Sequence, residues 1–129
     1  LQMRKLERAT NMNTGLNLNV ALNYGGRDEI IRTCKKIVQK VQKNEINLLD
    51  INEQAFESML DTNGQSNPDV IIRTAGEQRI SNFLLWQAAY SEFYYTSLTW
   101  PEFTSNHLRS ALSELSNRSR TYGKNTASS

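Results

Sequence analysis

Four polar residues in the middle of the chain have the chemistry of a phosphate-binding site: Arg73, Glu77, Arg79 and Ser81. Arg73 ends the β-branched run 69–73, which predicts a buried strand, and in parallel α/β sheets ligands bind at the carboxyl ends of the strands. Each guanidinium offers phosphate oxygens a planar fork of donors. Ser81 is expected to open a helix, so its hydroxyl and the free N–H groups of the first turn would point to the same crevice.

The same residues also fit a purely structural interpretation. Arg73 can pair with Glu77 in an ion pair, and Ser81 can be an ordinary helix N-cap. The spacing alone favours neither the diphosphate site nor the structural interpretation.

Glu92 is a candidate ligand of a divalent cation. The pattern places it at the C-terminal end of a predicted buried helix over 83–90, where the helix dipole disfavours an anion. Carboxylate oxygens are the ligands that Mg²⁺ prefers. An exposed glutamate at a helix end is the alternative, and both remain open.

The first half of the chain is expected to supply a strand and a long helix. Apolar and polar residues alternate over 16–22, which predicts a strand. Gly25 and Gly26 follow, either in a simple tight turn or in a loop that cradles a phosphate. Apolar residues at helical spacing predict an amphipathic helix over 28–43, with Cys34 as a core thiol on its apolar face.

The second half continues the alternation of strands and helices. The patterns predict a short helix capped by Asn52, strands at 69–73 and 93–96, the buried helix 83–90, and a last helix capped by Thr104. Four residues of that last helix, Leu108, Ala111, Leu112 and Leu115, are expected to face inward. The alternation predicts an α/β fold with a parallel sheet and helices on both faces.

The composition predicts a single soluble domain and excludes several classes of protein. With 129 residues, 38% hydrophobic and 22% charged, the chain is neither a disordered tail nor a coiled coil. One cysteine and one histidine exclude a disulfide framework and a Cys/His zinc site. A net charge of +2 is too small to indicate nucleic acid as a partner.

Two blocks of the sequence resemble one protein family. Residues 68–87, PDVIIRTAGEQRISNFLLWQ, with their continuation through Glu92 to Phe103, are similar to the signature of the cis-prenyltransferases, the undecaprenyl diphosphate synthase-like family. Residues 23–29, NYGGRDE, resemble the preceding block of that family at the expected distance. The similarity covers 1–123 as part of one domain and leaves 124–129 as a frayed tail.

The resemblance implies a prenyltransferase that condenses isopentenyl diphosphate onto an allylic, farnesyl diphosphate-like substrate, with Mg²⁺ as cofactor and a Z-polyprenyl diphosphate as product. Carried over by position, Arg73, Arg79, Ser81 and the Ile80 backbone would hold isopentenyl diphosphate, Glu77 would orient the arginines, and Glu92 would ligate Mg²⁺. The resemblance therefore favours the diphosphate site over the structural interpretation.

The sequence departs from the family at its N-terminal motifs. The Asp-Gly-Asn-x-Arg motif, which supplies the catalytic aspartate and the allylic phosphate site, has no counterpart, and 61–64 lacks the arginine that would follow. We therefore interpret the sequence as the C-terminal half of a cis-prenyltransferase, with the isopentenyl diphosphate half-site, no catalytic residue and no expected activity alone. The alternative is a non-catalytic partner subunit of a prenyltransferase complex.

The resemblance also bears on assembly and location. It implies a homodimer, and it implies peripheral contact with a membrane through the lipid product. The expected location is the cytoplasm or an organelle such as a plastid.

Overall fold

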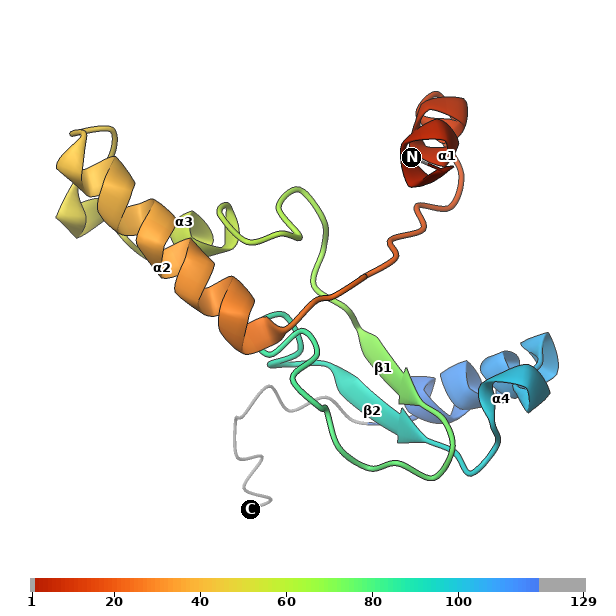
Figure 1. Cartoon of the computed structure of the whole chain (residues 1–129). Helices are drawn as coiled ribbons and strands as arrows, with labels where there is room; N and C mark the ends of the chain where they lie inside the picture. The colour runs from red at the N-terminus through yellow and green to blue at the C-terminus, as the bar shows by residue number, and fades with distance from the viewer. Residues whose placement is uncertain (1, 119–129) are drawn as a thin grey trace, which may run out of the picture.

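A computed structural model describes residues 2–118, as helices around a small parallel sheet (Figure 1). The helices are α1 (Gln2–Thr10), α2 (Gly26–Gln42), α3 (Glu53–Glu57) and α4 (Ser105–Ser116), with 3₁₀ turns η1 (Leu48–Asp50) and η2 (Trp100–Glu102); the strands are β1 (Val70–Arg73) and β2 (Glu92–Tyr95). The predicted tail 124–129 lies outside the described residues.

The sheet confirms the α/β class and two of the three predicted strands. β1 and β2 run parallel, with Val70 opposite Glu92 and Arg73 opposite Tyr95. β-branched and aromatic side chains favour the extended conformation in both strands. The chain after Arg73 projects past the carboxyl ends of the strands before it returns to Glu92 (Figure 1).

The predicted strand over 16–22 is wrong. The segment is irregular, and Leu16 and Leu22 expose 94% and 69% of their surface. A strand exists only where a neighbour accepts and donates its ladder hydrogen bonds. Among residues 2–118, β1 and β2 pair with each other and neither pairs with this segment.

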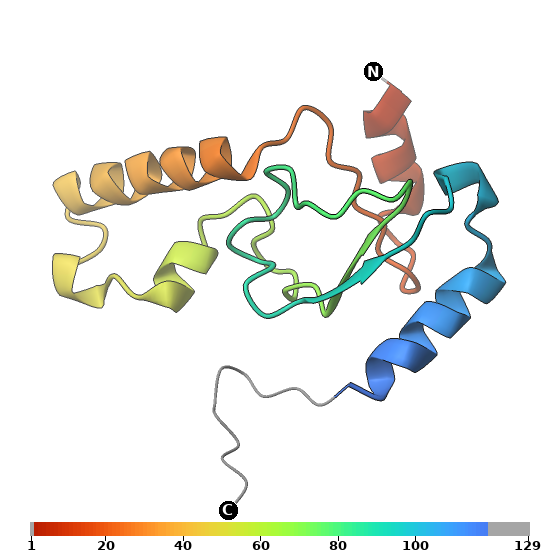
Figure 2. The same ribbon diagram turned by 90° about the horizontal axis from the view of Figure 1, so that it is seen from below.

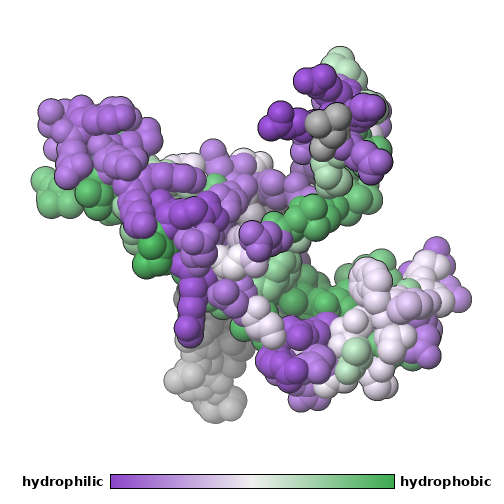
Figure 3. Space-filling view, in the orientation of Figure 1, coloured by the Kyte–Doolittle hydropathy of each residue, from purple (hydrophilic) through white to green (hydrophobic). Residues whose placement is uncertain are grey.

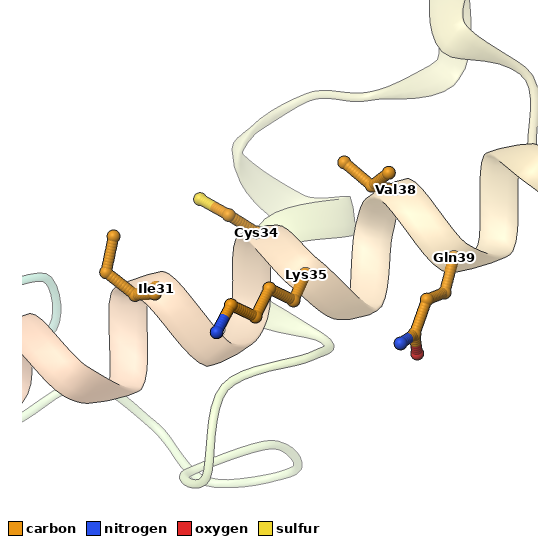
Figure 4. A pocket seen from close by; sticks show the side chains of 5 residues that line it. All are labelled: Ile31, Cys34, Lys35, Val38 and Gln39. Carbon is orange, nitrogen blue, oxygen red and sulfur yellow. The ribbon is translucent and has the colours of Figure 1, made fainter.

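The long amphipathic helix is confirmed as α2, but it buries a different face from the expected one. The buried residues of this face include Glu29, Thr33 and Ile37. They lie beside the segment that follows α3, and Thr33 Oγ1 donates to the carbonyl of Met59 in that segment at 3.4 Å. Cys34 is exposed, so the prediction of a core thiol is wrong. Figure 4 shows Ile31, Cys34 and Val38 projecting from the same side of the helix.

The predicted helix 83–90 is wrong as well. The segment forms a series of turns, and Ser81, Asn82 and Leu84 have φ angles of 47°, 64° and 46°, which a right-handed helix excludes. The carbonyl of Asn82 accepts a hydrogen bond from the N–H of Gly26 instead of serving a helical ladder. Tertiary contacts with α2 therefore replace the local structure that the apolar run predicted.

Both predicted helix caps are confirmed. Asn52 Oδ1 accepts a hydrogen bond from the Ala55 N–H at 2.9 Å at the start of α3. Thr104 and His107 form a reciprocal capping box at the start of α4. The inward face of α4 is confirmed only in part, since Ala111 and Leu115 are buried while Leu108 and Leu112 expose 39% and 47%.

Little of the described part of the chain, residues 2–118, is buried. Its buried apolar residues are Ile37, Leu60, Ala88, Ala111 and Leu115. The helices extend away from the sheet in different directions (Figure 2), and apolar side chains gather on the visible surface of the connection from α1 to α2 and near the sheet (Figure 3). No helix within residues 2–118 is both long enough and apolar enough to cross a membrane.

Candidate functional site

The structure brings Arg73, Glu77 and Arg79 together at the carboxyl end of β1. Glu77 Oε2 lies 3.7 Å from Arg73 Nη2 and also forms an ion pair with Arg79 Nη2. Arg73 Nη1 donates a hydrogen bond to the Arg79 carbonyl at 2.7 Å. One carboxylate therefore holds two guanidiniums side by side.

The loop between β1 and Glu77 is itself held in place by the chain that follows β2. The Ala75 and Gly76 N–H groups donate to the carbonyls of Leu98 and Thr96 at 2.7 and 2.9 Å. Gly76 has a φ of 70°, a conformation that glycine adopts without a steric cost. These bonds fix the path that carries Glu77 to the two arginines.

The charge and exposure of this cluster suit an anionic ligand. Two guanidiniums against one carboxylate leave one net positive charge, and the Arg79 side chain is 67% exposed. Glu77 Oε2 is buried and, among the described residues, receives no hydrogen bond of good geometry despite its two cationic neighbours. The guanidinium of Arg79, paired with Glu77 but largely exposed, can donate to phosphate oxygens.

Ile80 and Ser81 follow in the chain, but not at a helix start. Ile80 is half-buried and Ser81 is exposed. Because the helix predicted over 83–90 does not form, the free N–H groups of a first helical turn are not available beside Ser81. The predicted contribution of a helix N-terminus to the site is therefore wrong, and only the hydroxyl and the local backbone remain.

The structure places Glu92 away from the arginines. Glu92 begins β2 opposite Val70, three residues before the level of Arg73, which corresponds to about 10 Å along a strand. The sequence predicted that Glu92 ends a helix, and this prediction is wrong because Glu92 begins a strand. Its carboxylate pairs with Arg118 Nη1 at 3.3 Å, and carboxylates, Glu114 first and then Glu92, raise the pKa of Arg118 above its usual range.

The carboxylates of residues 2–118 do not by themselves suit Mg²⁺. No group of three or more Asp, Glu, His or Cys side chains within this part of the chain is close enough to hold a metal ion. Glu92, the predicted ligand, already has a cationic partner in Arg118. A divalent cation at Glu92 would therefore need further ligands besides these side chains.

Sequence reasoning missed the role of the two glycines. A Cβ on Gly26 would lie 2.8 Å from Leu85 Cγ and 3.2 Å from the Asn82 carbonyl, and a Cβ on Gly25 would lie 2.8 Å from Asn82 Nδ2. Gly25 is extended, with a φ of −148°. The pair therefore serves a close approach to residues 82–85 and not a tight turn at positive φ, and nothing in the local sequence could show this.

A buried carboxylate beneath the same contact was also missed. Glu29 is 1% exposed and accepts hydrogen bonds from Tyr24 Oη at 2.5 Å, from the Asp61 N–H at 2.8 Å and from Gln87 Nε2 at 3.1 Å. Burial and, next, the bond to Glu29 raise the pKa of Tyr24 above its ordinary value. Glu29 stands in the first turn of α2, where the helix dipole favours any carboxylate, so its place in the sequence does not reveal that it is buried.

Comparison with known proteins places these motifs in a family. A family model described as undecaprenyl diphosphate synthase matches residues 1–123. The isoprenyl transferase of Clostridium tetani is 49% identical over 122 residues, which are 95% of this chain and 48% of that protein. The (2E,6E)-farnesyl-diphosphate-specific ditrans,polycis-undecaprenyl-diphosphate synthase of Yersinia pseudotuberculosis is 45% identical over 125 residues, 97% of this chain and 50% of that protein.

A solved structure has the same fold. The crystal structure of lavandulyl diphosphate synthase from Lavandula x intermedia, in complex with dimethylallyl diphosphate, superposes with a TM-score of 0.89 and 39% identity over 94% of this chain and 52% of that one. The chain thus spans about half the length of these relatives. On the family match, the sequence identities and the shared fold, this chain belongs to the cis-prenyltransferase family, that of undecaprenyl diphosphate synthase.

Proposed function

We propose that this chain carries the isopentenyl diphosphate-binding part of a cis-prenyl chain-elongating enzyme. The observation that supports the proposal is the pair of guanidiniums, Arg73 and Arg79, held on Glu77 at the carboxyl end of β1. This is the edge of a parallel sheet where ligands bind, and the cluster has a net positive charge.

Each residue has a distinct part in this proposal. Arg79, the more exposed arginine, donates to the diphosphate oxygens, and Arg73 supports it from the end of the strand. Glu77 pairs with both guanidiniums and limits their repulsion. Ile80 and Ser81, which follow Arg79 in the chain, contribute a backbone N–H and a hydroxyl.

The reaction proposed for the complete enzyme condenses isopentenyl diphosphate onto an allylic diphosphate and yields a Z-polyprenyl diphosphate. The relatives support diphosphates as substrates: one is named as farnesyl-diphosphate specific, and one was crystallised with dimethylallyl diphosphate. We also propose that the enzyme is a homodimer with peripheral membrane contact through its product. Any magnesium in it would need ligands beyond the carboxylates of residues 2–118.

Binding and turnover test separate parts of the proposal. Titration of the 129-residue chain with isopentenyl diphosphate in a calorimeter should show saturable binding that Arg79→Ala weakens. Incubation of the same chain with labelled isopentenyl diphosphate and farnesyl diphosphate should give no elongated product. Absence of binding would contradict the half-site, and elongation above background would contradict the interpretation that this chain lacks the other half of the reaction.

A further inference from the structure

One side chain, Asn82, fastens the loop of the candidate site to the start of α2. Its backbone carbonyl accepts a hydrogen bond from the Gly26 N–H at 2.7 Å, and its side-chain Oδ1 accepts one from the Arg27 N–H at 2.9 Å. The residue at the N-cap itself, Gly25, has no side chain to do this. Asn82 therefore satisfies N–H groups that every helix start leaves free, from a distant part of the sequence.

The backbone at Asn82 depends on this fastening. Ser81, Asn82 and Leu84 all have φ angles in the left-handed region, where residues other than glycine are held only when the surroundings fix them. Asparagine tolerates this region better than most residues. The contacts with α2 are thus what keep residues 81–84 in an otherwise unfavourable conformation.

A second contact holds the far side of the same loop. Gln87 Nε2 donates to both carboxylate oxygens of Glu29, at 3.2 and 3.1 Å, and lies 3.0 Å from Thr62 Oγ1. Gln87 and Glu29 are both almost completely buried. The loop from Arg79 to Gln87 is therefore attached to α2 at two points, of which Asn82 is the one closer to the arginine cluster.

We propose that Asn82 is a positioning residue for the diphosphate site, which deepens the proposed function and rests on it. By holding the first turn of α2, Asn82 sets where Arg79, Ile80 and Ser81 stand relative to Arg73. It acts without touching the ligand, because both of its oxygens are engaged by α2. For the same reason the first turn of α2 serves this loop and not a phosphate.

Three substitutions separate the hydrogen bond from the backbone conformation. Asn82→Gly permits the positive φ but removes the Oδ1 acceptor, and Asn82→Ala removes the acceptor and strains the backbone as well. Asn82→Asp keeps an acceptor at the same place. The matched control is Asn52→Ala, since Asn52 Oδ1 accepts from a helix N–H at the same 2.9 Å, at the start of α3 and away from the arginines.

Hydrogen–deuterium exchange gives a readout that needs no ligand. In the 129-residue chain, Asn82→Gly and Asn82→Ala should speed exchange in residues 79–84 and in the first turn of α2, whereas Asn82→Asp should keep the protection. Asn52→Ala should speed exchange at α3 alone. If residues 79–84 exchange at the same rate in Asn82→Gly as in the unaltered chain, the proposal is overturned.

Calorimetric titration with isopentenyl diphosphate gives the second readout. Asn82→Gly should weaken binding roughly three- to tenfold, the equivalent of one lost hydrogen bond, while Asn52→Ala should lower the melting temperature without changing the affinity. Asn82→Asp is compared only in the exchange experiment, because it adds a negative charge beside the site. Faster exchange with unchanged affinity would show that Asn82 is structural and not a positioning residue.

If the proposed function is wrong, the binding measurements give a different result. If the unaltered chain and Arg79→Ala both fail to bind isopentenyl diphosphate, the half-site assignment fails, and the role of Asn82 toward the diphosphate fails with it. The exchange data would still decide whether Asn82 holds the loop.

Discussion

Arg73 donates a hydrogen bond from its Nη1 to the backbone carbonyl of Arg79, at 2.7 Å. The guanidinium at the end of β1 therefore binds the main chain of the very residue that offers the second guanidinium. Arg73 is the less exposed of the two side chains, at 31% against 67% for Arg79. The two arginines are thus not equivalent, since one supports the loop and the other faces solvent.

Substitution of the two arginines should separate these roles. Arg79→Ala should weaken binding of isopentenyl diphosphate by about 1.5–3 kcal/mol, the value of a charge-assisted hydrogen bond, and leave the melting temperature nearly unchanged. Arg73→Ala should weaken binding to a similar extent and also lower the melting temperature, because it releases the Arg79 carbonyl. Calorimetry and thermal melts on the same samples measure both effects. Equal melting temperatures for the two variants would contradict the conclusion that Arg73, and not Arg79, supports the loop.

Gly26→Ala should destabilise the fold. The new Cβ would meet Leu85 Cγ at 2.8 Å and the Leu85 N at 3.1 Å, and overpacking of this kind costs about 1–3 kcal/mol. Denaturant unfolding measures the loss. Gly15→Ala is the matched control, because nothing lies within 4 Å of its added methyl group; equal stability of the two variants would show that the close approach of α2 and residues 82–85 is not tight.

Acid should weaken the contact between α2 and the segment after α3. Arg32 donates to both carboxylate oxygens of Asp61, at 2.8 and 2.6 Å, and this lowers the pKa of Asp61 below its usual range. A carboxyl whose pKa is depressed by folding stabilises the fold above about pH 4, and that contribution is lost as the pH falls through the folded value. Both side chains are 40% exposed, so salt should screen part of the effect.

A pH series of unfolding measurements tests this. Stability should fall more steeply below pH 4 in the unaltered chain than in Asp61→Asn, which cannot titrate. Parallel curves for the two proteins would show that Asp61 contributes nothing to the acid transition.

The isolated chain should associate through its exposed apolar surface. Ile31 and Val38 are each 55% exposed and flank the exposed Cys34 on one side of α2, and apolar patches of this kind drive association. Sedimentation at tens of micromolar, about where exposed patches associate, should show species larger than a monomer. The double variant Ile31→Glu, Val38→Glu should reduce association without a lower melting temperature.

A control variant and a second measurement test this prediction further. Ile37→Glu places the same charge on the buried face of the same helix and should unfold the protein, so it controls for a general effect of glutamate in α2. Reaction of Cys34 with a thiol reagent should slow as the protein concentration rises. A concentration-independent reaction rate together with a monomeric sedimentation profile would contradict the prediction.

The elements that could be predicted from the amino-acid sequence are those whose signals are local. Residues 70–73 and 92–95 are strands because β-branched and aromatic side chains favour extended backbone. Asn52 and Thr104 start helices because each side chain finds its partner three residues away. The spacing of Arg73 and Glu77 offered their ion pair only as one of two open interpretations, and the contact of Glu77 with both arginines was implied by the family resemblance.

The features that could not be predicted from local patterns are those that depend on partners far away in the sequence. Residues 16–22 alternate like a strand but have no neighbouring strand among the described residues, and a strand cannot form without one. The apolar run 83–90 resembles a buried helix. Asn82, which immediately precedes it, is hydrogen-bonded to α2, and Ser81, Asn82 and Leu84 have left-handed φ angles that a right-handed helix excludes. Glu92 therefore begins a strand and pairs with Arg118, and the glycine pair at 25–26 serves packing. Backbone hydrogen bonds must be satisfied somewhere, and a local pattern does not reveal which distant segment will satisfy them.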